Sequence, residues 1–392
     1  MSEPAASAAS AHVPMLPFAK PCISEAAIQA VADVLRSGWI TSGPKVVAFE
    51  QAMAAYVGAP HAVAVNSATT GLDLVCAAMD FQDGDEVIVP AINWVSGPNM
   101  IELNGGRCVF CDVVPGTLNA DLDDVARKIT PRTRAIMPVH FAGAPLDLDR
   151  LKAIIAGRPI RIIEDCAHAA GTRWNGTHVG SAEVGVFSFH PTKNMTTAEG
   201  GMIVCRDEEL AAKLRVLRFH GIRKDAWKNH SRSGKDLYQV LSPGRKGNLP
   251  DTLAVLGLHQ LADLDQMNAE RTRQAARYHA ALAGLRVARP LDLPTAAGVM
   301  HAWHIYVVLI APGVDRGRVV DGLEQRGIGT ALHFPPVHTQ AYYRQTYPDC
   351  RLPASEDVGA RLLTIPLFPG MTDADQDRVV AALHAVEAEV LP

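Results

Sequence analysis

Seven short runs of apolar residues recur between positions 61 and 205, and we interpret them as β-strands. They are rich in Val and Ile and apolar at nearly every position, as expected for strands buried on both faces of a parallel sheet. Helical stretches separate several of them, which predicts an α/β domain. The predicted strands span 61–65, 86–90, 107–113, 135–140, 160–165, 185–190 and 201–205.

A helical pattern precedes these strands in the stretch SEAAIQAVADVLRSG. Ser24 is suited to cap its start and Gly38 to end it. Ile28, Val31 and Leu35 recur at helical spacing and form one face of the predicted helix.

The texture of the chain changes near residue 250, which indicates a second domain. A long helical stretch at 248–285 is expected to connect to a strand at 304–310, a helix around 319–325 and a strand-like run at 327–334. Thr372 and Asp375 suit a capping box for a final helix, with an apolar stripe of Val379, Leu383, Val386 and Val390. We therefore expect a disordered tail at 1–15, a large domain at 16–250, and a connecting helix with a smaller C-terminal α+β domain at 251–392.

Composition narrows the class of protein. The chain has 392 residues, a net charge of −4, 48% hydrophobic and 20% charged residues, which is typical of a globular protein with no electrostatic attraction to nucleic acid or an acidic membrane. We see no apolar stretch long enough for a membrane span, and the first 15 residues lack the features of a secretory signal. An odd count of seven cysteines favours reduced thiols in a cytoplasm.

Polar residues follow four of the predicted strands, where open parallel sheets bind their ligands. The turn 66–71 precedes a helix and could bind an anion, Trp94 could stack on an aromatic ligand, Asp165 ends a buried strand, and Lys193 lies in a polar loop. Alone, each has a structural explanation: a helix cap, core packing, an ion pair or a surface lysine. Together they supply an anion seat, an aromatic plate, a carboxylate for a pyridinium and an amine for an aldehyde, which favours a pyridoxal phosphate site.

Other motifs carry less weight. Cys108 and Cys111 point to roughly opposite faces of a predicted strand and lack a second pair, so we expect no metal site. His301 and His304 frame a Trp at a strand entrance, and we interpret them as structural. The chain contains neither a G-x-G-x-x-G after a strand nor a G-x-S-x-G elbow, which disfavours a nicotinamide oxidoreductase and a serine hydrolase.

From about Leu16 to the C-terminus, the chain resembles the DegT/DnrJ/StrS family of pyridoxal-phosphate sugar aminotransferases. The motifs that carry the resemblance are SGWITSGP, NSATTG, NWVS, EDCAHAAG, FSFHPTKN and TTAEGGM. The stretches FHGIRKDAW, VLSPGRKGNL, HAWHIYVV, RGIGTALHFPPVHTQAYYR and PLFPGMT resemble the subgroup that makes UDP-4-amino-4-deoxy-L-arabinose for lipid A. The resemblance implies fold type I, with a mostly parallel seven-stranded sheet between helices.

The resemblance also implies roles for individual residues. Lys193 matches the lysine that forms a Schiff base with the cofactor, and Asp165 matches the carboxylate paired with its pyridine nitrogen. The matching cofactor contacts are His168 beside the ring hydroxyl, Trp94 stacked on the ring, and Thr69, Thr70 and Ser188 at the phosphate. In relatives an Asn of the second subunit completes the phosphate site. Here either Lys246 or Asn248 could fill that role, while His333, Phe334 and His338 lie where relatives contact the nucleotide sugar.

The implied activity is transfer of an amino group from glutamate, which becomes 2-oxoglutarate, to a 4-keto sugar nucleotide, in a cytoplasmic homodimer with shared active sites. UDP-4-keto-pentose is the first choice of acceptor. A 4-keto-6-deoxyhexose or 3-keto sugar nucleotide for O-antigen or antibiotic sugars is the alternative. Related dehydratases carry His in place of the lysine, so Lys193 argues against dehydration, and the complete set of Lys193, Asp165 and Ser188 argues against a non-catalytic binding protein.

Overall fold

The computed structural model describes residues 14–222, 238–294 and 296–391. The predicted tail at 1–15 lies outside these residues apart from its last two, and the FHGIRKDAW stretch lies partly outside them. Among the described residues no helix combines the length and the apolar character needed to cross a membrane. All seven cysteines are free thiols.

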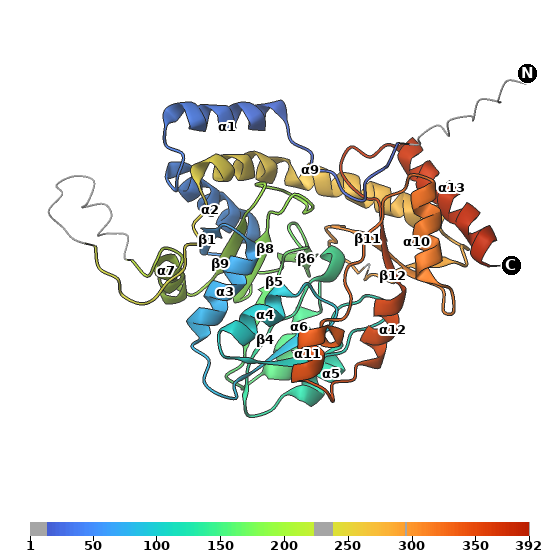
Figure 1. Cartoon of the computed structure of the whole chain (residues 1–392). Helices are drawn as coiled ribbons and strands as arrows, with labels where there is room; N and C mark the ends of the chain where they lie inside the picture. Colours follow the sequence, from blue (N-terminus) through green and yellow to red (C-terminus); the bar gives the residue numbers. More distant parts are fainter. Residues whose placement is uncertain (1–13, 223–237, 295, 392) are drawn as a thin grey trace, which may run out of the picture.

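A seven-stranded sheet forms the centre of the larger part of the molecule (Figure 1). Its order is His61–Val65 (β1), Gly201–Cys205 (β9), Val184–Ser188 (β8), Arg161–Asp165 (β5), Thr133–Ile136 (β4), Glu86–Pro90 (β2) and Arg107–Cys111 (β3). Only β9 runs antiparallel to its neighbours. The mostly parallel sheet and all seven predicted strands are therefore confirmed. The strand predicted at 135–140 begins and ends earlier, as β4, so residues 137–140 follow the strand and do not belong to it.

Helices cover both faces of this sheet, because successive side chains of each buried strand point to opposite sides. Ala62 and Ala64 of β1 belong to one core layer and Val63 and Val65 to the other. The first layer includes Pro44–Val57 (α2), Leu122–Lys128 (α5), Leu148–Ile155 (α6) and Asp251–Ala281 (α9). The second includes Ala68–Met79 (α3), Ser96–Leu103 (α4) and Glu208–Leu217 (α7).

Helix α9 runs from the large sheet to a smaller C-terminal unit (Figure 1). The unit contains an antiparallel sheet of Ala288–Pro290 (β10), Tyr306–Ile310 (β11) and Leu362–Ile365 (β12), with the helices Arg316–Gln325 (α10) and Asp373–Val390 (α13). The predicted capping box of Thr372 and Asp375 is present at the start of α13. The strand-like run 327–334 makes only two isolated bridges, from Ile328 to Leu16 and from Ala331 to Thr364.

The remaining elements are short and connect these layers. Arg173–Trp174 (β6) and Thr177–His178 (β7) form a two-stranded sheet. Phe141–Gly143 and Val337–Thr339 are 3-10 turns. Ala341–Thr346 (α11) and Pro353–Arg361 (α12) lie between the strands of the small sheet in sequence.

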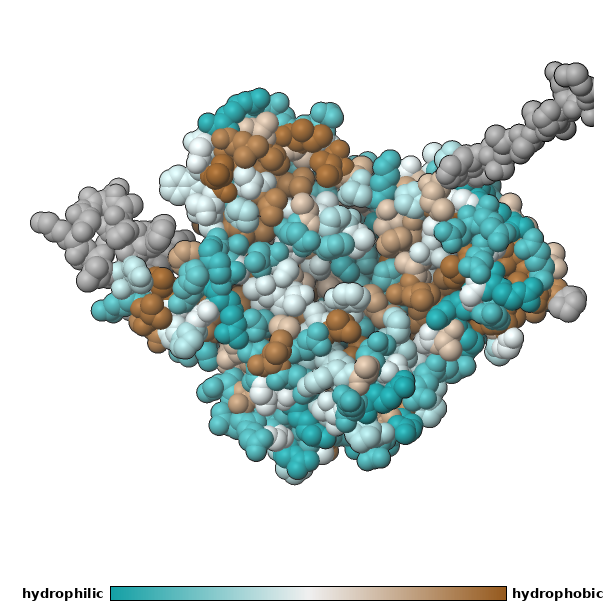
Figure 2. Space-filling model, viewed as in Figure 1, coloured by the Kyte–Doolittle hydropathy of each residue, from teal (hydrophilic) through white to brown (hydrophobic). Residues whose placement is uncertain are grey.

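The first helix, Glu25–Ser37 (α1), begins and ends as predicted but directs its apolar face outward. Ser24 caps its start and Gly38 ends it in the left-handed conformation. Its buried residues are Ala27 and Val34, while Ile28 and Leu35 are 51% and 56% exposed. Figure 2 shows the resulting apolar surface along α1, where Trp39 and Ile40 are also exposed.

The outer edge of β1 is covered by side chains. The Ala64 N–H donates to Glu50 (2.9 Å), and the Ala64 carbonyl accepts from Arg218 (2.7 Å), which also pairs with Glu50. Arg215 donates to the Ala62 carbonyl. The backbone groups that an edge strand leaves free are thus occupied.

Candidate active site

The predicted site residues Asp165, Ser188 and Lys193 lie around the ends of two adjacent parallel strands. Asp165 is the last residue of β5 and Ser188 the last of β8, and these strands pair directly. After Ser188 the chain turns back into the antiparallel β9, and Lys193 lies in this connection. The Phe189 N–H donates to the Gly200 carbonyl (2.9 Å), which closes the loop at its base.

Helix α9 fixes the loop that carries Lys193. The buried Asn194 side chain donates to Asn268 (2.7 Å) and to the Ala302 carbonyl (2.6 Å). The Thr196 N–H donates to Gln260, two helical turns earlier on α9 (3.1 Å). Because the residues that follow Lys193 are held by buried groups, its side chain extends from a fixed backbone.

Asp165 and Lys193 are two oppositely charged groups in a poorly solvated place. Asp165 is 3% exposed, and burial raises its pKa against the opposing effects of the Ala167 N–H (3.0 Å) and the charge of Lys193. Burial lowers the pKa of Lys193 to about 8, although the Asp165 carboxylate opposes this change. A protonated heterocycle beside Asp165 would compensate its desolvation, and an amine with this pKa is prepared to react with an aldehyde.

Aromatic rings line the space beside Lys193. His168 lies against Phe334, with ring centres 5.8 Å apart and planes 29° apart, and Phe334 in turn contacts Trp94 at 5.6 Å. The Trp94 side chain is 56% exposed. His168 accepts from the Ala142 N–H at Nδ1 (3.3 Å), so its Nε2 carries the proton in the neutral ring. The structure thus brings the predicted residues Trp94, His168 and Phe334 together.

His304 lies beside Lys193, a position that its interpretation as a structural residue does not anticipate. Its Nε2 lies 3.5 Å from Lys193 Nζ, and its ring centre lies 4.3 Å from that of His168. The sequence pattern predicts a structural role for both His301 and His304. His301 instead stacks on Trp303 at 4.0 Å. The signal in the sequence was the second histidine of HAWH, but its approach to Lys193 requires the packing of the two units.

The predicted phosphate turn, 66–71, runs into the first turn of helix α3, which begins at Ala68. Ser67 caps the helix by accepting from the Thr70 N–H (3.0 Å), while Thr69 is exposed and Thr70 half-buried. Gly201 of β9 backs this turn, because a Cβ there would lie 2.6 Å from Ala68 N. The start of a helix has free N–H groups that suit a phosphate, and here Gly201 of β9 packs closely against it.

The segment containing Lys246 and Asn248 lies beside the same turn of its own chain. The Asn66 N–H donates to the Gly247 carbonyl (2.8 Å), and Asn248 bridges to Val65. A Cβ at Gly247 would lie 2.5 Å from Thr70 Cγ2, so the segment approaches the turn closely. Lys246 donates to Asn248, whose side chain donates to Ser42 (2.7 Å).

The predicted substrate residues occupy two places. His333 contacts Phe334 and bonds to Thr364 (2.8 Å), and burial lowers its pKa to about 4 with the charge of Lys193 acting in the same direction. His338 is buried, and its Nε2 lies 3.1 Å from Glu356. His333 and Phe334 therefore belong to the group around Lys193, whereas the contacts of His338 are with Glu356 and Phe110.

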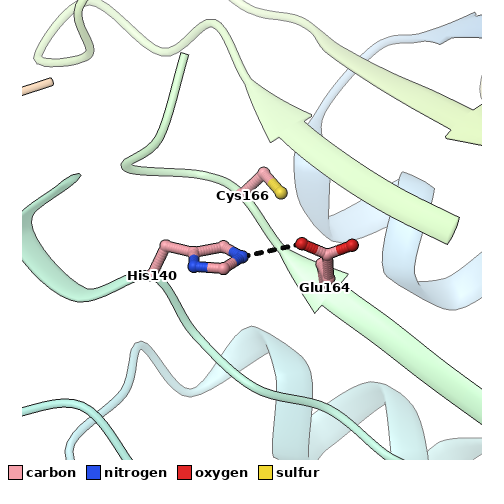
Figure 3. A group of neighbouring side chains, drawn as sticks. All are labelled: His140, Glu164 and Cys166. Carbon is pink, nitrogen blue, oxygen red and sulfur yellow. Dashed lines mark hydrogen bonds and ion pairs between the residues drawn. The ribbon is translucent and has the colours of Figure 1, made fainter. Parts of the chain in front are cut away.

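His140, Glu164 and Cys166 form a buried cluster at the end of β5 (Figure 3). Glu164 and Cys166 are the neighbours of Asp165 in the sequence. His140 accepts from the Leu146 N–H at Nδ1 (3.1 Å), so its Nε2–H donates to Glu164 (2.9 Å). Glu164 also accepts from the Gly180 N–H (2.7 Å). These bonds satisfy both histidine nitrogens and anchor the end of β5, which positions Asp165.

Comparison with known proteins identifies the family. Residues 21–384 match the model of the DegT/DnrJ/EryC1/StrS aminotransferase family. The chain is 32% identical to Spr1654 of Streptococcus pneumoniae, assigned as a sugar aminotransferase, in its PMP form (TM-score 0.90; 96% of this chain and 100% of the other covered). The PLP form of that protein matches with a TM-score of 0.88 at 30% identity, over 96% and 100% of the chains.

Two further structures match over similar lengths. The aminotransferase TlmJ of Streptoalloteichus hindustanus is 32% identical (TM-score 0.89; 96% and 99% covered). Helicobacter pylori PseC, an aminotransferase of pseudoaminic acid biosynthesis, is 26% identical (TM-score 0.90; 96% and 100% covered).

The residues of this chain fit pyridoxal phosphate on their own chemistry. The desolvated Asp165 carboxylate suits the pyridine nitrogen, the amine of Lys193 suits the aldehyde, and the N–H groups before α3 suit the phosphate. The match of the family model to nearly the whole chain points to the same cofactor. The chain belongs to the DegT/DnrJ/EryC1/StrS aminotransferase family and is a pyridoxal-phosphate-dependent sugar aminotransferase.

Proposed function

We propose that this enzyme transfers the amino group of glutamate to a 4-keto sugar nucleotide, with UDP-4-keto-pentose as the preferred acceptor and UDP-4-amino-4-deoxy-L-arabinose as the product. The observation that carries the aminotransfer chemistry is the placement of Lys193 opposite the buried Asp165 at the ends of β8 and β5. The preference for a pentose rests on the sequence motifs shared with the arabinose subgroup. Modification of lipid A is the use that this product implies.

Lys193 and Asp165 divide the work of the reaction. The bound cofactor supplies an electron sink that makes a substrate C–H bond acidic. The Asp165 carboxylate favours the protonated pyridine nitrogen on which this sink depends. Lys193, once free, accepts the proton from the amino acid carbon at Nζ and returns it to a neighbouring carbon, so one side chain serves as general base and then as general acid.

The site offers groups that could bind a sugar nucleotide. The exposed face of Trp94 and the ring of Phe334 lie together near His333, an arrangement suited to stacking on a sugar or base. His338, the third predicted substrate residue, is buried beside Glu356 and Phe110 and makes no hydrogen bond or ring contact with this group of described residues. A 4-keto-6-deoxyhexose or 3-keto sugar nucleotide is the second candidate acceptor, and the similarity to PseC, an aminotransferase of pseudoaminic acid biosynthesis, supports testing acceptors other than the pentose.

We also propose that two copies associate in the cytoplasm through the apolar surface of α1 and share their phosphate sites. Ile28, Leu35 and Trp39 are all more than half exposed, and an apolar surface of this kind is typical of an interface. Asn248 bonds to Ser42, three residues after Trp39. The segment of Lys246 and Asn248 therefore lies at the margin of this surface, where it could reach a partner's phosphate.

A panel of acceptors tests the substrate. The purified enzyme with pyridoxal phosphate and glutamate is given UDP-4-keto-pentose, a 4-keto-6-deoxyhexose nucleotide or a 3-keto sugar nucleotide, and the amino sugar is measured by mass spectrometry. We expect kcat/KM for the pentose to exceed the others by about 10-fold or more, the usual effect of one carbon in a fitted pocket. Lys193→Ala is the control. If the hexose nucleotide is converted faster, it and not the pentose is the preferred acceptor. If no acceptor receives the amino group, none of these three sugar nucleotides is the substrate.

A further inference from the structure

The buried histidines of this protein differ in how their ring nitrogens are satisfied. In His140 and His178 both nitrogens have hydrogen-bond partners, as expected for structural residues. In His304, which is 2% exposed, Nδ1 has no hydrogen-bond partner among the described residues, and Nε2 faces Lys193. His301 Nε2 and His338 Nδ1 also lack a partner among the described residues, so what distinguishes His304 is that its other nitrogen faces the Lys193 amine.

The backbone fixes His304 where it can meet Lys193. The His304 N–H donates to the Ala142 carbonyl (2.9 Å), and its own carbonyl accepts from Arg271 (3.1 Å). The ring is held on one side by His168, 4.3 Å away between centres. The separation of 3.5 Å between Nε2 and Lys193 Nζ is at the long limit of a hydrogen bond, and catalytic contacts of this kind commonly tighten when a ligand binds.

Burial, supported by neighbouring positive charge, keeps the His304 ring neutral. Burial lowers its pKa well below the usual value, and Lys193, Arg271, His168 and His333 act in the same direction. Arg271 is 2% exposed and donates to the carbonyls of Trp303, His304 and Leu367. A neutral ring retains a lone pair, so Nε2 can accept a hydrogen bond from an ammonium group.

We propose that His304 is a positioning residue that accepts a hydrogen bond at Nε2 from the ammonium form of Lys193. It would hold the Lys193 ammonium between its capture of a proton from the amino acid carbon and the return of that proton to the next carbon. No bond to His304 forms or breaks, and its ring stays neutral. The proposal rests on the role of Lys193 in the proposed function.

A matched pair of amides tests this role. In His304→Gln the side-chain amide reaches the position of Nε2, whereas in His304→Asn it ends one methylene short, near the position of Nδ1. Both variants carry the same functional group at a similarly buried position. If His304 had only a structural role, the Gln variant would therefore not behave more like the wild type than the Asn variant. His301→Asn, on the neighbouring ring that stacks on Trp303, is the control, and thermal unfolding checks that each variant folds.

The first measurement uses the chain without cofactor or substrate. Reductive methylation of Lys193 with formaldehyde is followed by peptide mass spectrometry across pH, with the exposed Lys152 as internal reference. The wild-type rate should rise through pH about 8. Without the acceptor the ammonium is less stable, so His304→Asn should move this inflection lower by about one pH unit, and His304→Gln should remain near wild type.

The second measurement uses the enzyme loaded with pyridoxal phosphate. We expect His304→Asn to lower kcat by about 10-fold or more with KM for glutamate little changed, and His304→Gln to restore most of kcat. Equal inflections and equal kcat in the Gln and Asn variants would overturn the proposal. If the wild-type enzyme instead fails to convert glutamate to 2-oxoglutarate, the proposed function fails, while the methylation profile still decides whether His304 holds the ammonium.

Discussion

Replacing Gly201 by alanine should damage the phosphate turn specifically. The added Cβ would lie 2.6 Å from Ala68 N, 2.7 Å from Ser67 C and 2.9 Å from Phe187 O, all of them backbone atoms. Ordinary contact begins at 3.4 Å, so the turn must retreat from β9 by about 0.8 Å at Ala68 N. Overpacking of this kind lowers the free energy of unfolding by about 1–3 kcal/mol. In addition, the N–H groups of the displaced turn no longer point at the phosphate.

Two affinities of the chain without bound cofactor isolate this effect. We expect Gly201→Ala to weaken binding of pyridoxal phosphate by about 10-fold to 100-fold, while binding of pyridoxal, which lacks the phosphate, changes little. Gly116→Ala is the control, because its Cβ would meet only the side chain of Asp292 at 3.3 Å. The measurements are absorbance titration for affinity and chemical denaturation for stability. Equal losses for both ligands, or no loss for either, would refute the assignment of the turn to the phosphate.

Three further substitutions separate chemistry from stability. Lys193→Ala should keep the fold and abolish covalent capture of pyridoxal phosphate, so borohydride reduction should leave the protein mass unchanged; a cofactor-sized increase would contradict the assignment. Asp165→Asn should lower kcat by about 100-fold or more while thermal unfolding shifts little, and near-normal turnover would exclude its role at the ring nitrogen. Glu164→Leu should lose about 2–4 kcal/mol of unfolding free energy, because it leaves His140 Nε2–H and the Gly180 N–H unpaired; chemical denaturation with unchanged stability would disprove this.

The strands were predictable because a buried strand has a local signature. Continuous Val and Ile runs located β1, β2 and β9 to the residue. Direction has no such signature, since a strand buried on both faces has the same composition in either orientation. The antiparallel course of β9, which forms the hairpin around Lys193, therefore emerged only with the structure.

The apolar face of α1 shows a second limit of pattern analysis. Periodicity correctly grouped Ile28 with Leu35 on one side of the helix. It did not reveal that this side faces away from the protein's own core, because the same stripe serves a core or an external surface. The small residues Ala27 and Val34 make the internal contact instead.

The site residues that follow strands of the large sheet could be predicted from the sequence. The residue that the smaller C-terminal unit contributes could not. Asp165 and Lys193 lie 28 positions apart in sequence, Asp165 at the end of β5 and Lys193 in the loop that follows its paired strand β8. His304 comes from the entrance to β11, 111 positions after Lys193, and reaches it only because the small unit packs against the large sheet. Nothing local in the sequence distinguishes His304, which lies beside Lys193, from His301, which stacks on Trp303.

The side chains that cover β1 restrict how copies of this protein can aggregate. The backbone groups that an incoming strand would need are already bonded to Glu50, Arg215 and Arg218. A strand from another molecule could add to β1 only after the half-buried ion pair of Arg218 and Glu50 had broken. Aggregation by strand addition is therefore obstructed at the outer edge of β1, although the apolar face of α1 is exposed to solvent. Concentrated preparations should accordingly self-associate through helical contacts that reverse on dilution.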